Sequence, residues 1–373
     1  MKIAKINGID IKLRFSTLFI VVLVGFYAAI FYGSIVSGAT ITALILVGLI
    51  NGIIILFSVL IHELFHSIVA QRYGLKVTEI EMYIFGGASK IEEEPKTPKS
   101  ELVISIVGPL SSLLIGFLFL TGLLFNPLSI STILYVTLLY SGITNIGLGI
   151  FNLLPAYPMD GGRVLRAILW SRKHDIISAT KTASRVGSFL AYGLIGYGLF
   201  STFFIGLFSG FWLIIIGIFL NNQTKQAYLQ TRNELTLSRL KAKDIMSLPK
   251  LEIPFDTTVT NAIKYYFIPY KKSYFPVIRG NMIVGIIDIE TIKRIPEFQR
   301  DKTIVGYVME RISQIPEIKE NDTGKLVLQK MSQMKTSPHV VAVTEENEIV
   351  LGLIGEEDLV ESIRFCELNH NQC

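Results

Sequence analysis

Residues 42–70 read TALILVGLINGIIILFSVLIHELFHSIVA, an apolar run with two histidines and one glutamate near its end. A run of this length can cross a bilayer as a helix, which needs about 20 mainly apolar residues. Ionisable side chains are costly in hydrocarbon, so their presence there usually marks a functional site. Residues 42–70 therefore predict a membrane-spanning helix that carries a functional site.

The polar group in this run is His62-Glu63-Leu64-Phe65-His66. Histidines four residues apart project from one face of a helix and can bind the same metal ion. Glu63 stands beside the first histidine, where a metal hydrolase needs its general base. The alternative is that the histidines only form hydrogen bonds between helices. We favour a zinc-hydrolase site because both histidines have ligand spacing.

The composition of the 373-residue chain is typical of a membrane protein with a soluble part. Half of the residues are hydrophobic and only 17% are charged. Apolar runs occupy residues 15–33, 42–70, 102–125, 130–151 and 186–224. The last run is long enough for two spans joined by a turn near residues 206–210. We expect a polytopic α-helical membrane domain of six transmembrane helices at residues 1–222, followed by a polar linker at residues 223–241.

The distribution of charge orients these spans. Lysine and arginine residues lie before the first span and after the second, fourth and sixth, whereas residues 34–40, 126–129 and 201–210 contain neither. The positive-inside rule then predicts a multi-pass membrane protein with both termini in the cytoplasm. The net charge of +5 is then a topology signal. We expect no nucleic-acid partner, because no basic face interleaved with aromatic residues is present.

A second unusual segment follows the fourth expected span, at the same membrane depth as the histidines. Residues 152–162 read NLLPAYPMDGG, and the two prolines prevent a regular helix. Irregular backbone is tolerated at this depth only against protein or water. We expect Asp160 to turn inward and complete the three protein ligands of a catalytic zinc site. The alternative is that Asp160 caps the helix expected at residues 163–173.

The two motifs, HELFH and NLLPAYPMDGG, resemble those of the site-2 protease family of intramembrane zinc metalloproteases. That family has HExxH on one core transmembrane helix and NxxPxxxxDG at the end of another. The resemblance covers essentially the whole chain and is closest to the branch with C-terminal CBS domains. Many members have a proline two residues after the first motif proline, where this chain has Tyr157.

The resemblance implies a role for each matching residue. His62, His66 and Asp160 would bind one catalytic Zn²⁺, Glu63 would act as general base, and Asn152 would position the substrate or stabilise the intermediate. A structural alternative for Asn152 is a helix C-cap or an interhelical hydrogen bond. The expected function is hydrolysis of peptide bonds in transmembrane proteins, within the lipid bilayer and near its cytosolic face, in regulated intramembrane proteolysis. The resemblance also implies that this membrane is the cell membrane.

Residues 77–93 alternate as two strands on either side of a break at Gly86-Gly87. They lie between the second and third expected spans, where family members carry a membrane-associated β-hairpin. We expect a cytosolic-side β-hairpin here. It is either an ordinary loop or an edge to which an unwound substrate adds as a strand.

The soluble part contains a weak internal repeat. KDIM at residues 243–246 is echoed by GYVM at 306–309, and VGIID at 284–288 by LGLIG at 351–355. The repeat resembles a tandem CBS pair, an α/β module that often senses adenine nucleotides. We place CBS motif 1 at residues 242–300 and CBS motif 2 at residues 301–369.

The resemblance gives one candidate nucleotide contact in the CBS pair. The nucleotide motif has Ser or Thr three residues after a glycine and Asp three residues further on, and only Asp358 matches it. An adenine nucleotide at Asp358 would regulate the enzyme. A second interpretation is that the pair forms a homodimer or docks on the membrane domain. The alternative function is a CBS-regulated ion transporter or channel, because intramembrane His and Asp also line ion paths; it has no need of Glu63.

Overall fold

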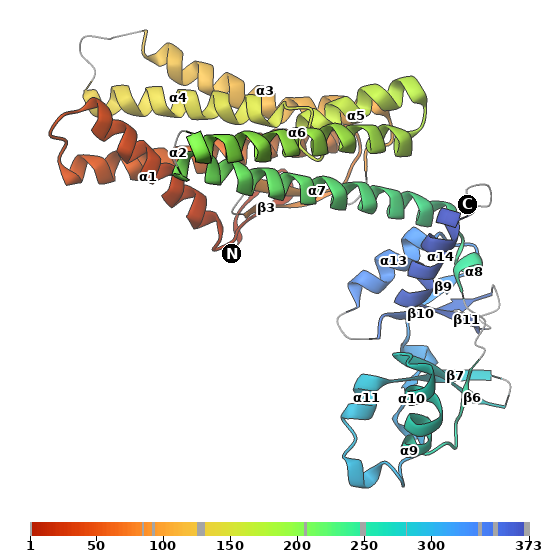
Figure 1. Cartoon of the computed structure of the whole chain (residues 1–373). Helices are drawn as coiled ribbons and strands as arrows, with labels where there is room; N and C mark the ends of the chain where they lie inside the picture. Colours follow the sequence, from red (N-terminus) through yellow and green to blue (C-terminus); the bar gives the residue numbers. More distant parts are fainter. Residues whose placement is uncertain are drawn as a thin grey trace. The chain divides into compact units, whose positions relative to one another are not determined.

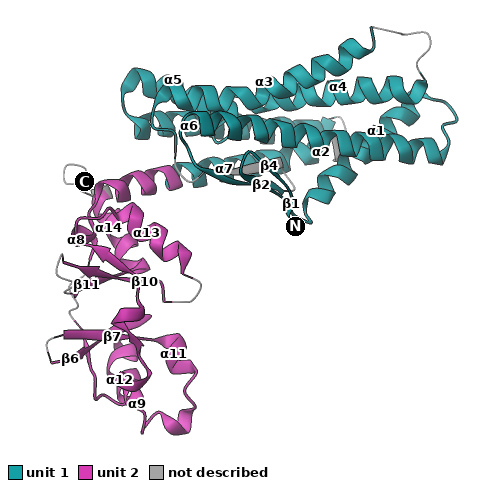
Figure 2. Cartoon of the chain, turned by 180° about the vertical axis from the view of Figure 1, so that it is seen from behind, with its two compact units in different colours: residues 1–229 teal, residues 230–373 magenta. Residues whose placement is uncertain are grey.

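The computed structural model describes residues 2–83, 86–91, 94–124, 131–204, 207–246, 251–280, 282–334, 338–345 and 350–368. The chain divides into two compact units, residues 1–229 and 230–373 (Figures 1 and 2). Unit 1 is mainly helical and contains one small sheet, and unit 2 contains two small sheets with short helices.

The helices of unit 1 follow the apolar runs of the sequence. They are α1 (Thr17–Ile35), α2 (Ile41–Arg72), α3 (Pro98–Gly122), α4 (Thr132–Asn152), α5 (Asp160–Lys173), α6 (Ile176–Phe204) and α7 (Leu207–Arg239). Among the described residues, five helices are long and apolar enough to cross a membrane, namely α1, α2, α3, α4 and α6. They correspond to the first five expected spans. The sixth expected span falls in the first half of α7, and the total of six stays a prediction.

The segment expected as a linker is largely helical. Residues 223–239 belong to α7, and the boundary between the two units falls inside this helix, after Leu229. The change from apolar to polar composition near residue 222 is therefore a change within one helix. The turn expected at residues 206–210 is wrong for residues 207–210, which belong to α7, and residue 206 lies outside the described residues.

Helices α3 and α4 pack side by side through glycines (Figure 1). A Cβ atom on Gly116 would lie 2.9 Å from the carbonyl oxygen of Gly142. Only glycine leaves room for backbones this close, and small residues have this role in membrane helix packing generally. This close packing fixes α3 against α4. Helix α3 contacts the two histidines of α2, and α4 leads into the loop before Asp160.

A four-stranded sheet lies against α2. Its strands are β1 (Lys2–Ile6), β2 (Ile9–Leu13), β3 (Val77–Tyr83) and β4 (Gly86–Ile91), in the order β1-β2-β3-β4. Ile9 and Ile80 of the sheet are buried in one cluster with Ile55 and Val59 of α2. Strands β3 and β4 pair antiparallel within the segment where the sequence predicts a hairpin, and the cytosolic-side hairpin itself stays a prediction. The expected break at Gly86-Gly87 is wrong, because both glycines belong to β4.

Unit 2 repeats one arrangement of strands. One sheet contains β5 (Ile253–Pro254), β6 (Tyr274–Arg279), β7 (Met282–Asp288) and β8 (Glu310–Arg311), and the other contains β9 (Glu317–Lys319), β10 (Val340–Thr344) and β11 (Val350–Gly355). Strands β5 and β6 are parallel and β6 and β7 antiparallel. Strands β9, β10 and β11 pair in the same way. The sequence repeat thus corresponds to a structural repeat.

The helices of unit 2 are short and precede, separate or follow these strands along the chain. They are α8 (Ala242–Ile245), α9 (Val259–Ala262), a π-helical turn (Ile263–Phe267), α10 (Ile268–Tyr270), α11 (Ile289–Lys293), α12 (Val305–Val308), α13 (Gly324–Gln333) and α14 (Glu356–Leu368). Two 3₁₀ turns cover Glu297–Gln299 and Ile312–Gln314. The segment 369–373 expected at the end of CBS motif 2 and beyond lies outside the described residues.

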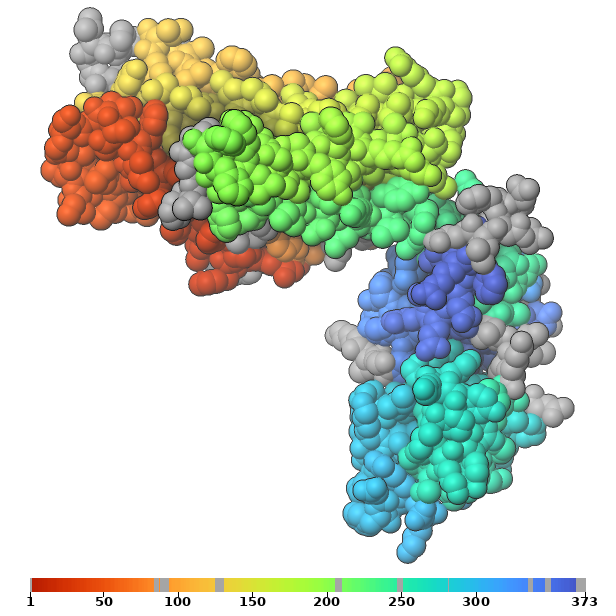
Figure 3. Space-filling model, in the orientation of Figure 1, coloured from red at the N-terminus to blue at the C-terminus, as the bar shows by residue number. Residues whose placement is uncertain are grey.

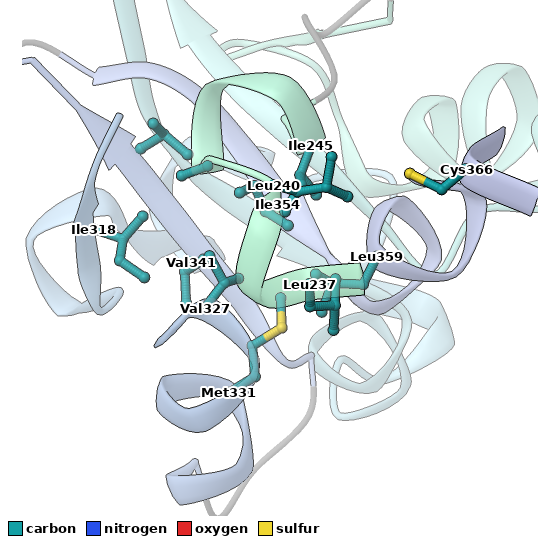
Figure 4. Close-up of a cluster of buried hydrophobic side chains, with 12 residues drawn as sticks. Leu237, Leu240, Ile245, Ile318, Val327, Met331, Val341, Ile354, Leu359 and Cys366 are labelled. Carbon is teal, nitrogen blue, oxygen red and sulfur yellow. The ribbon is translucent and has the colours of Figure 1, made fainter. Parts of the chain in front are cut away.

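The core around β10 begins before the expected CBS boundary. Leu237 at the end of α7 and Leu240 pack with Ile318, Val341 and Ile354 (Figure 4). These two leucines are buried although they come from the polar segment expected as a linker. The fold of unit 2 therefore starts upstream of residue 242.

Candidate metal centre

Three side chains from distant parts of the sequence converge in unit 1. His62 and His66 come from α2, and Asp160 is the first residue of α5. Asp160 Oδ2 lies 3.1 Å from His62 Nε2 and 3.2 Å from His66 Nε2, and the two Nε2 atoms are 3.1 Å apart. In the described part of the chain, this is the one group of His, Cys, Asp and Glu side chains with the geometry to share a metal ion.

Helix α3 holds the other ring nitrogen of each histidine. His62 Nδ1 lies 2.9 Å from the hydroxyl oxygen of Ser112, and His66 Nδ1 lies 2.6 Å from the carbonyl oxygen of Ile104. Because a carbonyl only accepts, His66 Nδ1 carries the proton and donates it. In a neutral ring, Nε2 then carries a lone pair. Hydrogen bonds of this kind fix the tautomer and orientation of metal-binding histidines.

The chemistry of the donor atoms fits a zinc ion. Two imidazole nitrogens and one carboxylate oxygen form the set of three protein ligands found in catalytic zinc sites, where the fourth position is kept for water. A neutral His66 cannot donate from Nε2, yet this atom lies within 3.2 Å of both His62 Nε2 and Asp160 Oδ2. A cation among these three atoms satisfies all of them at once.

A glycine of α3 makes room for the ring of His66. A Cβ atom on Gly108 would lie 2.1 Å from His66 Nε2, so any side chain at this position would displace the imidazole. This contact is not evident from the sequence. Its only local signal is a glycine beside Pro109 in the middle of an apolar helix.

Glu63 is half-buried and faces the hairpin. A Cβ atom on Gly87 of β4 would lie 2.3 Å from Glu63 Cγ and 3.0 Å from its Cδ. Glycine at this position therefore lets the backbone of β4 pass directly over the glutamate. The structure gives Gly87 a packing function in place of the strand break expected from the sequence.

The connection between α4 and α5 directs Asp160 inward. Helix α4 ends at Asn152 and α5 begins at Asp160, so residues 153–159 form a loop that contains both motif prolines. A Cβ on Gly161 would lie 2.1 Å from the carbonyl oxygen of Leu153, which means that α5 starts in close contact with the loop. The alternative interpretation is that Asp160 serves only as a helix cap. It does not account for the contacts of the Asp160 carboxylate with both histidines.

The remaining predicted site residues have contacts of their own. Asn152 is the last residue of α4, and its Nδ2 donates to the carbonyl oxygen of Leu148 at 3.0 Å. Asp358 lies in the first turn of α14 in unit 2. It accepts hydrogen bonds from the Gly355 amide at 2.7 Å and from the Tyr274 hydroxyl at 3.4 Å. Burial and the neighbouring Asp358 carboxylate raise the pKa of Tyr274, which keeps this hydroxyl protonated.

Comparison with known proteins decides the family. The sequence profile of peptidase family M50 matches residues 51–137 and 126–194, which include both motifs. The chain is 32% identical over 370 residues to the zinc metalloprotease MJ0392 of Methanocaldococcus jannaschii, with 99% of this chain and 97% of that protein covered. The chain belongs to peptidase family M50. This membership confirms the resemblance to site-2 proteases, and the M50 protein is a zinc metalloprotease.

Other comparisons cover both units. The profile of the CBS domain matches residues 242–297, within the expected CBS motif 1. The M50 protein is 28% identical over 368 residues to Rip3 of Mycobacterium tuberculosis, with 97% of this chain and 92% of Rip3 covered. The solved structure of the Site-2 Protease from Methanocaldococcus jannaschii matches 61% of this chain and 94% of that chain, at 33% identity and a TM-score of 0.42. The apolar helices and the family together make the M50 protein a multi-pass membrane protein.

Proposed function

We propose that the protein is an intramembrane zinc endopeptidase that cleaves transmembrane proteins near the cytosolic face of the cell membrane. The convergence of His62, His66 and Asp160, with Glu63 on the same helix, carries this proposal. Large hydrophobic side chains are exposed along α1 and α6, whose surfaces are in view in Figure 3. Lipid would cover such surfaces, since monomeric soluble proteins rarely expose apolar patches of this extent.

His62, His66 and Asp160 would hold the zinc ion. When bound, zinc supplies a Lewis acid that polarises the scissile carbonyl and lowers the pKa of a coordinated water toward ~7. Glu63 would accept the proton of the attacking water as the oxygen of that water bonds to the scissile carbonyl carbon, and would then deliver the proton to the amide nitrogen as the C–N bond breaks. We also assign Asn152 to substrate positioning, because the amide that bonds to Leu148 has a second N–H for a substrate carbonyl.

A transmembrane substrate has to unwind before cleavage, because the N–H and C=O groups of its helix are hydrogen-bonded to each other. Strand β4 lies at the edge of the sheet order β1-β2-β3-β4, and its Gly87 is packed against Glu63. An extended segment that adds to this edge would run beside the proposed general base. We therefore propose β4 as the element that holds the unwound substrate.

The topology of the proposed enzyme follows from the loop charges. Six spans with both termini in the cytoplasm would place the end of α2, and with it Glu63, in the cytosolic half of the bilayer. The β3–β4 hairpin would then lie on the cytosolic side.

Unit 2 would regulate cleavage. We propose that its CBS pair binds an adenine nucleotide at Asp358, or forms a homodimer. In the present arrangement Asp358 bonds to Gly355 and Tyr274. Both hydrogen bonds end on Oδ2, so a nucleotide would use Oδ1 of this carboxylate without displacing either of them.

The deciding experiment compares the wild type with Glu63→Gln on a panel of single-span model substrates in detergent, with zinc content measured on both. We expect Glu63→Gln to retain zinc and lose cleavage, because it removes the base and no proposed ligand. Glu79→Gln is the matched control, since Glu79 is a carboxylate on β3 that pairs with Lys12. Equal cleavage by wild type and Glu63→Gln, or zinc-free wild type, would contradict the proposal and favour the ion-transport alternative.

A further inference from the structure

Arg166 of α5 is a buried cation. Its side chain is only 3% exposed, and its Nε and Nη2 both lie 2.5 Å from Oε1 of Glu101, a residue of α3 that is 1% exposed. Its Nη1 donates to the hydroxyl oxygen of Tyr157 at 2.9 Å, and its guanidinium carbon lies 4.9 Å from the centre of the Tyr157 ring. The proposed mechanism uses none of these three residues.

A buried ion pair by itself is weak evidence for a role in stability. Desolvation of both charges offsets much of their attraction, and replacement by apolar side chains is often neutral or stabilising. The better-attested use of such a pair is to fix one register between two elements. Glu101 and Arg166 would therefore fix the register between α3 and α5.

The Glu101–Arg166 pair joins α3 to α5. Helix α3 orients the two histidines, and α5 begins with Asp160. Glu101, Ile104, Gly108 and Ser112 are spaced at i, i+3, i+7 and i+11, which places them along one face of α3. Ile104 and Ser112 contact the rings of His66 and His62. One face of α3 thus contacts both histidines and, through Glu101, the helix that carries Asp160.

Tyr157 connects the same group to the loop before Asp160. Its side chain is held by Arg166, and its carbonyl oxygen accepts a hydrogen bond of 2.6 Å from the hydroxyl of Thr224 on α7. Thr224 is 1% exposed, so no solvent competes for this bond. Contacts from α5 and α7 thus restrain the loop that precedes Asp160.

We propose that Glu101, Arg166, Tyr157 and Thr224 form a positioning clamp that sets the carboxylate of Asp160 against the two histidines. The clamp rests on the proposed function, in which Asp160 is a zinc ligand. Its members are positioning residues, because they touch neither the proposed ligand atoms nor the reacting groups. Loss of an outer contact of this kind typically weakens metal binding or activity by roughly 10- to 100-fold.

The first test removes one hydroxyl at a time from the full-length protein in detergent. Tyr157→Phe and Thr224→Val keep the side-chain shape and each lose one bond of the clamp. Matched controls are Tyr140→Phe, whose hydroxyl bonds to the Val24 carbonyl, and Thr180→Val, whose hydroxyl bonds to Ile176 within α6. The readouts are the zinc Kd by competition with a chromogenic chelator, the visible absorption of the Co²⁺-substituted protein, and kcat and KM separately.

We expect each clamp variant to raise the zinc Kd about tenfold and to change the Co²⁺ spectrum. The value of kcat should fall more than KM changes, because the clamp affects the ligand geometry and not substrate binding. The two controls should stay within about twofold of the wild type. A residue with a merely structural role would alter thermal unfolding but leave the Co²⁺ spectrum unchanged.

The second test removes both charges together. Loss of Arg166 alone leaves the buried Glu101 carboxylate without its cation and can prevent folding. Glu101→Met with Arg166→Met retains the stems and removes both buried charges, and Glu94, which also lies 3.7 Å from Arg166, is 35% exposed to solvent. We expect this double variant to fold and to show the same weakened zinc binding. Wild-type zinc affinity and Co²⁺ spectrum in this variant and in both hydroxyl variants would overturn the clamp.

Asp160→Asn separates the two possible failures. If it loses zinc while all clamp variants bind zinc like the wild type, the clamp is wrong and the proposed ligand set stands. If Asp160→Asn also binds zinc like the wild type, the ligand set itself is wrong, and the clamp fails with it.

Discussion

Asp160 in unit 1 and Asp358 in unit 2 both lie in the first turn of a helix, but their carboxylates contact different partners. Asp358 accepts the Gly355 amide, as acidic residues near helix N-termini usually do. Asp160 faces two histidines of another helix. The same residue type at a similar local position thus caps its helix in one unit and joins two histidines in a candidate metal centre in the other.

The reason for the difference lies in what surrounds each helix start. Asp160 follows a loop whose backbone packs against Gly161, and α2 presents two imidazoles opposite it. Opposite Asp358 is the hydroxyl of Tyr274. Local sequence places a carboxylate at a helix start, and tertiary packing decides what it binds.

The largest expected effect separates the two aspartates directly. Asp160→Asn should lower zinc affinity by roughly 100-fold or more and abolish cleavage, because an amide is a poor substitute for an anionic ligand. Asp358→Asn should leave zinc binding at the wild-type level. Metal content after dialysis against a chelator measures both. Retention of zinc by Asp160→Asn would remove the contrast between the two residues.

A somewhat smaller effect is expected when the space beside His66 is filled. Gly108→Ala should weaken zinc binding by roughly 10- to 100-fold, because its Cβ would lie 2.1 Å from His66 Nε2. Gly147→Ala is the control, since a Cβ on this glycine of α4 meets nothing within 4 Å. The zinc Kd of both variants, measured by chelator competition, tests the prediction, and equal values would show that the ring can move away without loss.

Removal of a hydrogen bond to a histidine should have a moderate effect. Ser112→Ala leaves His62 Nδ1 without its partner in α3 and should raise the zinc Kd about tenfold. Ser58→Ala is the control, because this hydroxyl of α2 bonds to the Ile54 carbonyl of its own helix. If Ser112→Ala binds zinc as tightly as the wild type, α3 does not orient His62.

The smallest effect concerns the pH dependence of unit 2. Burial first, and then the Asp358 carboxylate, raise the pKa of Tyr274 above its usual value of about 10. The folded state therefore holds this proton more tightly than the unfolded state, and the resulting stability is present below pH ~10 and is lost as the pH rises through the folded-state pKa.

Tyr274→Phe lacks this ionisation and should lose less stability in alkali than the wild type. Thermal unfolding of both proteins between about pH 9 and 11 measures the difference. Asp358→Asn should show a weaker pH dependence than the wild type, because it removes the anionic neighbour of the tyrosine. Parallel pH curves for the wild type and Tyr274→Phe would mean that Tyr274 ionises alike in the folded and unfolded states.

The features of the fold that depend on contiguous residues are the ones that the sequence predicts best. The first five spans follow from the length of apolar runs, a property of contiguous residues. The strands β1 and β2 were not anticipated, because β2 pairs with β3, whose residues lie far along the chain. The helix through residues 223–239 was also missed, since its polar residues and the two buried leucines near its end make no regular apolar face.

The sequence by itself determined the chemistry of this protein: its membrane spans, the paired histidines and glutamate of HELFH, and the carboxylate of the DGG segment. These features depend on residue type and helical period, which are local properties. Only the tertiary structure decided which atoms surround them. Gly87 over Glu63, Gly108 beside His66 and the Glu101–Arg166 pair join residues from different elements, and no spacing along the chain encodes such contacts.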